Sequence, residues 1–152
     1  MSRLSHGLAA GAVGTTLLNA ATYLDMTITA RGASSVPEQD VEKLAERYGI
    51  SLGGDEETVA NRKSAVGALM GILTGLSVGA VYGLVRPWAR GVPQSVASVI
   101  VCFATMAATD ASSAALGTTD PRSWTARDWA SDIAPHLVFG AGVVLAFDAI
   151  DD

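Results

Sequence analysis

The chain has 152 residues, enough for one domain, and only 16% of them are charged, whereas soluble proteins average near 25%. The net charge is −5 and the sequence has no basic cluster, which argues against nucleic acid as a partner. The single cysteine, Cys102, excludes an intrachain disulfide.

Four long segments of the sequence are almost free of charge. The first three have about the length that a helix needs to cross the bilayer core, roughly 20 residues, and the fourth reaches it only if the helix extends through Asp148 to Ile150. A soluble Ala/Gly-rich bundle is the alternative, but its helices would each show a polar face, which is absent here. We therefore predict an all-α polytopic membrane protein, with a single membrane domain over 1–152 and four transmembrane helices at about 4–26, 65–86, 94–116 and 133–150.

The first segment has a second interpretation, a secretory signal peptide with Arg3 as its basic end. Arginine outnumbers lysine, and alanine and glycine are abundant, which is typical of bacteria with GC-rich genomes. We expect a multi-pass protein of the bacterial cytoplasmic membrane. Most basic residues fall on the side of the first loop, so the positive-inside rule places that loop in the cytoplasm.

The loop over 27–64 contains a short amphipathic helix at about 36–48. Ser35 is a plausible N-cap, Pro37 suits the first helical turn, and Gly49 ends the helix. The next link, RPWARGVP, is tight and predicts that the helices 65–86 and 94–116 are antiparallel neighbours.

The link between the last two membrane helices predicts a short interfacial helix of its own. It holds the capping pattern TARD, and Trp124 and Trp129 are residues that favour the membrane–water interface. We expect this helix to be separate from the spanning helix that begins at about 133.

Glycine recurs at every fourth position of the second membrane segment, although glycine costs about 1 kcal/mol against alanine in a soluble helix. In lipid, such a row permits close helix packing. We call this row the glycine ladder and expect a glycine zipper, with either the first helix of the same chain or a second copy in a homo-oligomer filling the groove. The helix-packing residues are Gly67, Gly71, Gly75, Gly79 and Gly83, with Gly7 and Gly11 of the first helix.

Polar residues inside the apolar segments are candidates for a function, because ionisable groups are costly in a membrane. The candidate polar pathway consists of Asn19, Asp25, Asp110 and His136. Helix direction brings the ends of the first and third helices to the starts of the second and fourth. The alternative is that Asp25 and His136 are interfacial residues and that Asp110 makes a structural ion pair.

Familiar catalytic and nucleotide-binding motifs are absent from the sequence. We predict no catalytic residue, no metal site and no cofactor. His6 and His136 fall on opposite sides of the membrane and cannot share one metal within a subunit.

The segment DPRSWTARDWASDIAPHLVFG resembles the closing segment of the YagU-like small bacterial inner-membrane proteins. The resemblance rests on Trp129, His136, Leu137 and Val138 and covers about twenty residues. It implies a membrane role connected with acid tolerance and transfers no catalytic residue.

These observations favour a non-enzymatic membrane protein, acting as a structural or accessory subunit of a membrane complex, with membrane lipid and either a homo-oligomer or a larger complex as partners. The alternative is a small oligomeric channel or transporter for protons, ions or a small solute, using the candidate polar pathway. An intramembrane enzyme is a third hypothesis.

Overall fold

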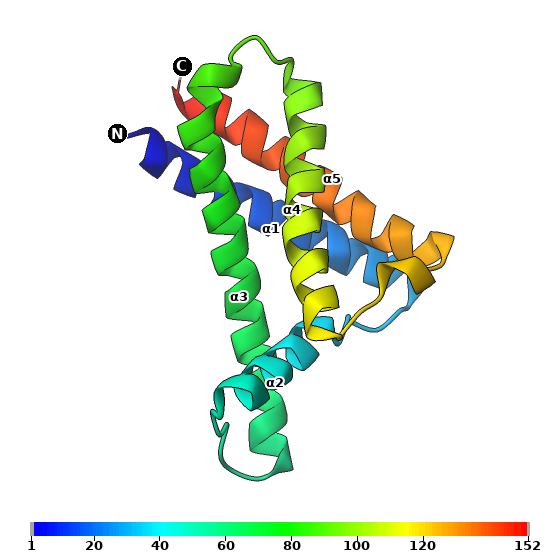
Figure 1. The fold of residues 1–152 in the computed structure, drawn as a ribbon. Coiled ribbons are helices and arrows are strands. Elements are labelled where there is room, and N and C mark those ends of the chain that lie inside the picture. The colour runs from blue at the N-terminus through cyan, green and yellow to red at the C-terminus, as the bar shows by residue number, and fades with distance from the viewer. Residues whose placement is uncertain (1, 152) are drawn as a thin grey trace.

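The computed structural model describes residues 2–151, and all the regular structure of that range is helical. The all-α prediction is therefore confirmed. In chain order the elements are α1 (Arg3–Thr29), α2 (Val36–Tyr48), α3 (Glu56–Val85), the 3₁₀ turn η1 (Arg86–Ala89), α4 (Gln94–Leu116), the 3₁₀ turn η2 (Pro121–Ser123) and α5 (Ala126–Asp151) (Figure 1).

Three segments are long and apolar enough to cross a membrane, which is compatible with a multi-pass membrane protein. They are Glu56–Ala89, Gln94–Leu116 and Ala126–Asp151. The helix α1 is long enough but less apolar, because Thr15, Thr16 and Asn19 interrupt its aliphatic residues.

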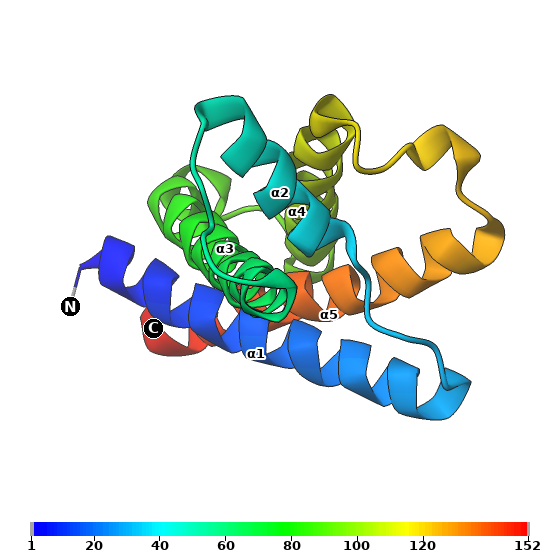
Figure 2. The ribbon, with the colours of Figure 1, turned by 90° about the horizontal axis from the view of Figure 1, so that it is seen from below.

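The long helices form two layers that cross each other. In one layer α1 and α5 run side by side and antiparallel, and in the other α3 and α4 lie across them (Figures 1 and 2). The helices α3 and α4 run antiparallel, as predicted for 65–86 and 94–116, but the prediction that they pack as neighbours is wrong, since they hardly touch. The turn between them, η1 with Arg90–Pro93, is long enough to let α3 pack on α1 while α4 packs on α5.

The core lies where the layers cross, and α5 supplies most of it. The side chains of Phe139, Val143, Val144 and Phe147 are each at most 1% exposed. They are packed with smaller residues, among them Ala10 of α1. The helices α1 and α5 form the central pair of the fold, because α1 also contacts α3 and α5 also contacts α4.

The helix boundaries agree with the prediction for α2 and α4, each of which ends at a glycine in a left-handed conformation. For α2 this glycine is Gly49, as predicted. The helix α3 begins nine residues earlier than predicted, at Glu56, because the Asp55 side chain accepts a hydrogen bond from the Thr58 amide at 2.9 Å and caps it.

The predicted separate interfacial helix before 133 is not formed. The Thr125 amide donates to Asp128 Oδ2 at 2.8 Å, and the Asp128 amide donates to Thr125 Oγ1 at 3.3 Å. This capping box starts α5 itself, and the helix then runs on through Pro135. Pro135 removes one backbone hydrogen bond without breaking the helix.

Glycines sit where helix backbones approach most closely. A Cβ atom on Gly79 would lie 2.5 Å from the Gly11 amide nitrogen and would also clash with the carbonyl oxygen of Gly7. A Cβ atom on Gly83 would lie 2.5 Å from the Arg3 carbonyl oxygen. The upper part of the glycine ladder is therefore filled by α1 of the same chain.

The ladder has different neighbours toward the start of α3. A Cβ atom on Gly67 would lie 3.0 Å from the Pro37 side chain of α2, and one on Gly71 would meet no atom within 4 Å. Two glycines of α5 also allow close approach: Gly140 lies against the α4 backbone at Ser98, and Gly142 lies against Gly14 of α1.

We predict that Gly79→Ala lowers stability, whereas Gly71→Ala does not. Both changes add the same methyl group to the same helix, but only the one at Gly79 forces two backbones apart, and such overpacking costs about 1–3 kcal/mol. Thermal unfolding followed by circular dichroism in detergent measures the difference. Equal melting temperatures for the two variants would contradict the packing role of Gly79.

Candidate functional site

A cavity of about 960 Å³ lies at the end of the molecule where α2 packs. We call it the polar cavity. It has walls from the second half of α1, the start of α2, the first half of α3, the end of α4 and the start of α5. Its polar lining consists of Thr22, Thr29, Arg31, Ser34, Asp40, Thr74, Thr109, Asp110, Ser112, Ser113, Thr119, Arg127, Asp128, Ser131, Asp132 and His136.

The inner wall of the polar cavity holds two carboxylates and an imidazole. His136 Nδ1 lies 2.8 Å from the Asp132 carbonyl oxygen and 3.4 Å from Asp132 Oδ1, one helical turn away on α5. Asp110 lines the same cavity from α4, near enough for its charge to interact with those of Asp132 and His136. Its only hydrogen bond within the described residues is a long one from Thr109, at 3.5 Å.

The floor of the polar cavity is fixed by Asp40 of α2, which is 9% exposed. Ser113 Oγ donates to Asp40 Oδ2 at 2.6 Å, and Thr118 Oγ1 donates to the other carboxylate oxygen. These bonds tie the start of α2 to the end of α4. The apolar face of α2, with Val41 and Ala45 buried, packs on α3.

Two members of the candidate polar pathway lie elsewhere. Asp25 forms an ion pair with Arg31 just beyond the end of α1, and Arg31 rather than Asp25 lines the cavity. Asn19 is exposed on α1 and does not line the cavity. The structure thus brings Asp110 and His136 together and leaves Asn19 and Asp25 outside.

The opposite end of the molecule holds a cluster of paired charges. Arg86 contacts Asp148 with two hydrogen bonds, of 3.0 Å from Nε and 2.9 Å from Nη2, and Gln94 donates to the same carboxylate at 3.0 Å. His6 Nδ1 lies 2.9 Å from Asp151 Oδ1, which joins the start of α1 to the end of α5.

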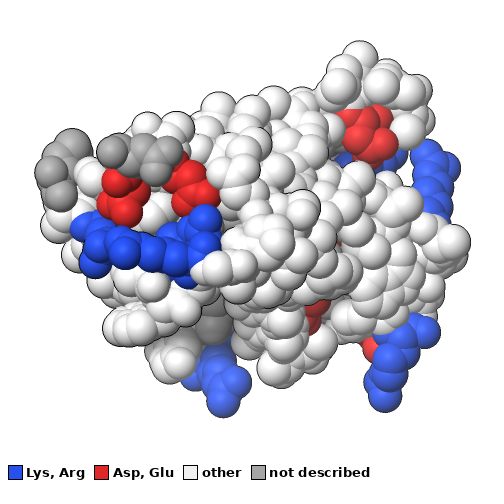
Figure 3. Space-filling model, turned by 90° about the horizontal axis from the view of Figure 1, so that it is seen from above, with Lys and Arg blue, Asp and Glu red and all other residues white. Residues whose placement is uncertain are grey.

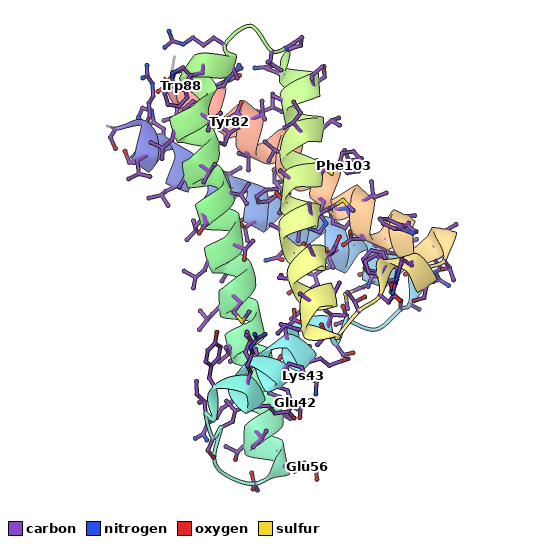
Figure 4. All side chains as sticks on the ribbon, in the orientation of Figure 1. Glu42, Lys43, Glu56, Tyr82, Trp88 and Phe103 are labelled. Carbon is purple, nitrogen blue, oxygen red and sulfur yellow. The ribbon has the colours of Figure 1, made fainter. Side chains whose placement is uncertain are left out.

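Charged and uncharged residues are also separated on the surface of the molecule. Viewed from this end, charged residues gather near the termini and at the margins, and a broad uncharged area separates them (Figure 3). Tryptophans lie at both ends of the long helices. Trp88, within η1, is 84% exposed (Figure 4), and at the other end Trp124 packs edge-to-face on Trp129, the two residues predicted to favour the interface.

Between α4 and α5, Asp120 and Arg122 form an exposed ion pair at 2.9 Å. The hydrogen bond from the Arg122 side chain lowers the pKa of Asp120, so this carboxylate is ionised at neutral pH.

No group of three His, Cys, Asp or Glu side chains within residues 2–151 is placed to hold a metal ion.

The sequence did not predict the roles of Asp40 and Asp132. Asp40 is not among the residues predicted for a site, yet its carboxylate accepts hydrogen bonds from two hydroxyl groups. The four-residue spacing of Asp132 and His136 was a usable signal, because residues one turn apart share a helix face. No local pattern joins Asp40 to Ser113, which is 73 residues away.

No protein-family model matches the chain, and neither a curated protein nor a solved structure shows significant similarity to it. The functional argument therefore rests on the geometry of this chain.

Proposed function

We propose that this chain is a four-span protein of the bacterial cytoplasmic membrane, with α1 as the fourth span and a glycine zipper between α1 and α3. The helix α1 has 27 residues, about 40 Å at 1.5 Å per residue, which is more than the bilayer core requires. It lies along α5, a candidate span, and its exposed residues Leu8, Val13 and Leu17 suit contact with lipid. The tryptophans at both ends fit the two membrane interfaces.

Four spans predict that Ser2 and Arg90 lie on one side of the membrane, with Ser34 and Asp120 on the other. If α1 lay flat on the surface, Ser2 would instead share the side of Ser34. Single cysteines at these positions, in a chain with Cys102→Ala, can be labelled with a membrane-impermeant maleimide in sealed vesicles of known orientation. Labelling of Ser2→Cys together with Ser34→Cys would contradict the fourth span.

The proposed role is that of a non-enzymatic structural or accessory subunit of a membrane complex. This proposal rests on a contrast between the charged groups of the chain, which are mostly paired, and its apolar helix faces, which are uncovered. Most charged groups of the long helices are engaged within the chain, as in Arg86–Asp148, His6–Asp151 and Asp25–Arg31. In contrast, wide apolar faces of α3 and α4 are uncovered, and a partner helix could seal them. The exposed residues include Leu69, Ile72, Leu73, Val81, Leu84, Val96, Val99, Ile100 and Phe103.

These uncovered faces support assembly better than the glycine ladder does. Gly75, Gly79 and Gly83 already lie against α1, and Gly67 lies against Pro37. Phe103 projects outward from α4 and is 51% exposed (Figure 4). A homo-oligomer or a larger complex would therefore form through α3 and α4, with lipid covering whatever a partner does not.

Native mass spectrometry of the protein, extracted gently from its own membrane, tests this role. We expect a stoichiometric complex, and we expect Phe103→Ser to weaken it because burying a hydroxyl in place of an aromatic ring loses apolar contact. Tyr23→Ser, which removes an exposed ring from the end of α1, is the matched control. A monomer carrying only lipid, for the wild-type chain, would contradict the accessory role.

The polar cavity favours a second candidate function, a small channel or transporter. Asp110, Asp132 and His136 line it together within apolar helices, where ionisable side chains are costly unless they have a role. The weak resemblance of the closing segment to the YagU-like proteins agrees with a role in proton stress.

A transport role predicts that Asp110→Asn reduces flux through the protein in proteoliposomes, because the substitution removes the charge but keeps the shape of the side chain. Proton flux can be followed with a trapped pH-sensitive dye, and Asp120→Asn serves as the control on an exposed pair. Wild-type flux in Asp110→Asn would count against the transport candidate.

A further inference from the structure

We propose that the polar cavity is a binding site for an organic cation, with an ammonium group placed between Asp110 and Asp132 and an apolar body lying against Leu18, Met70 and Pro135. This proposal names the ligand class for the second candidate function and rests on the same cavity, but it requires no transport.

The charge balance inside the cavity is the first support. Of the four aspartates in its lining, Asp40 accepts from Ser113 and Thr118, and Asp128 caps α5. Arg31 is paired with Asp25. Arg127 is exposed at the rim. The inner part is left with two carboxylates, Asp110 and Asp132, and one imidazole.

An incomplete hydrogen-bond network is the second support. Asp132 Oδ2 is buried and has no hydrogen-bond partner among residues 2–151, although the other carboxylate oxygen lies 3.4 Å from His136 Nδ1. A buried acceptor without a donor is costly. An ammonium group carries up to three donors and a positive charge, so it can donate to this oxygen and neutralise one of the two carboxylate charges.

The size and walls of the cavity indicate an organic ligand rather than a bare ion. The volume of about 960 Å³ falls in the range of small-molecule pockets, roughly 300–1,000 Å³. The walls combine apolar side chains with hydroxyl groups, and the described residues form no metal-ligand cluster. A water-soluble amine and the ammonium headgroup of a membrane lipid share this chemistry.

Isothermal titration of the full chain in dodecyl maltoside, an uncharged detergent, tests the proposal with two probes of equal shape. We expect saturable binding of 2-naphthylmethylammonium and much weaker binding of the neutral 2-naphthylmethanol. Equal affinities for the two probes, or no saturable binding of the amine, would overturn the proposal.

Three variants locate the site. Asp110→Asn and Asp132→Asn should each weaken amine binding by about tenfold, the effect of losing one charged hydrogen bond, about 1.4 kcal/mol. Asp120→Asn, on the exposed pair outside this cavity, should bind like the wild type. If both cavity variants bind the amine with wild-type affinity, the ammonium group does not lie between Asp110 and Asp132, and the proposal is wrong.

Gly71→Phe fills the cavity without touching the carboxylates. A Cβ atom at Gly71 meets nothing within 4 Å, so this variant should fold normally and lose binding. Binding to this variant can still be measured if an aspartate variant fails to fold. Undiminished binding by folded Gly71→Phe would place the ligand elsewhere and overturn the proposal.

Added lipids separate the two sources of the ammonium group. If phosphatidylethanolamine displaces the probe and phosphatidylglycerol does not, the ligand is a lipid headgroup. If neither displaces it, the ligand is a soluble amine. If the amine binds but the protein shows no flux, only the transport candidate is contradicted. If the amine does not bind, the cation site is wrong and the accessory role is unaffected.

Discussion

The backbone contact between Gly79 of α3 and Gly7 and Gly11 of α1 is the constraint on which the rest of the structure depends. In lipid, apolar side chains gain little by leaving the solvent, so helices associate through close van der Waals contact. Glycine at this crossing removes the side chains that would separate the two backbones. The same device recurs at Gly140 and Gly142, where α5 approaches α4 and α1. Close contact between backbones thus holds three helix pairs together: α1 with α3, α5 with α4, and α5 with α1.

This close packing also explains why the molecule has two unlike ends. Rows of small residues spaced four apart pack at a crossing angle of about 50°. The helices α1 and α3 lie in close contact from Arg3 and Gly83 to Thr15 and Gly75, and beyond that point they diverge (Figure 1). Where the ends of the helices converge, Arg86, Asp148 and Gln94 lie within hydrogen-bond distance. Where they diverge, the polar cavity lies between α1, α3, α4 and α5, and the start of α2 covers one side of it.

Local signals in the sequence predicted much of this fold. Charge-free segments located the long helices, and Gly49 and the TARD pattern marked real helix ends. The wrong predictions concern contacts between distant segments. A tight link does not make α3 and α4 pack on each other. The glycines of α3 bring it against α1, and Gly140 of α5 brings that helix against α4. Asp110 and His136 were predicted to converge and both line the cavity. The engagement of Asp25 with Arg31 depends on how the chain leaves α1, which hydropathy does not encode.

The carboxylates at the two ends of the molecule differ in how completely their oxygens are hydrogen-bonded. Asp148 receives three hydrogen bonds from Arg86 and Gln94, so its cost of burial is offset within the chain. Within the described part of the chain, Asp132 has one carboxylate oxygen without a donor, and Asp110 accepts only a long hydrogen bond from Thr109. If both clusters served only to hold helices together, Asp110 and Asp132 would be better replaced by apolar residues, because an unsatisfied buried charge lowers stability. A cation completes the network at the diverging end in the way that Arg86 completes it at the other.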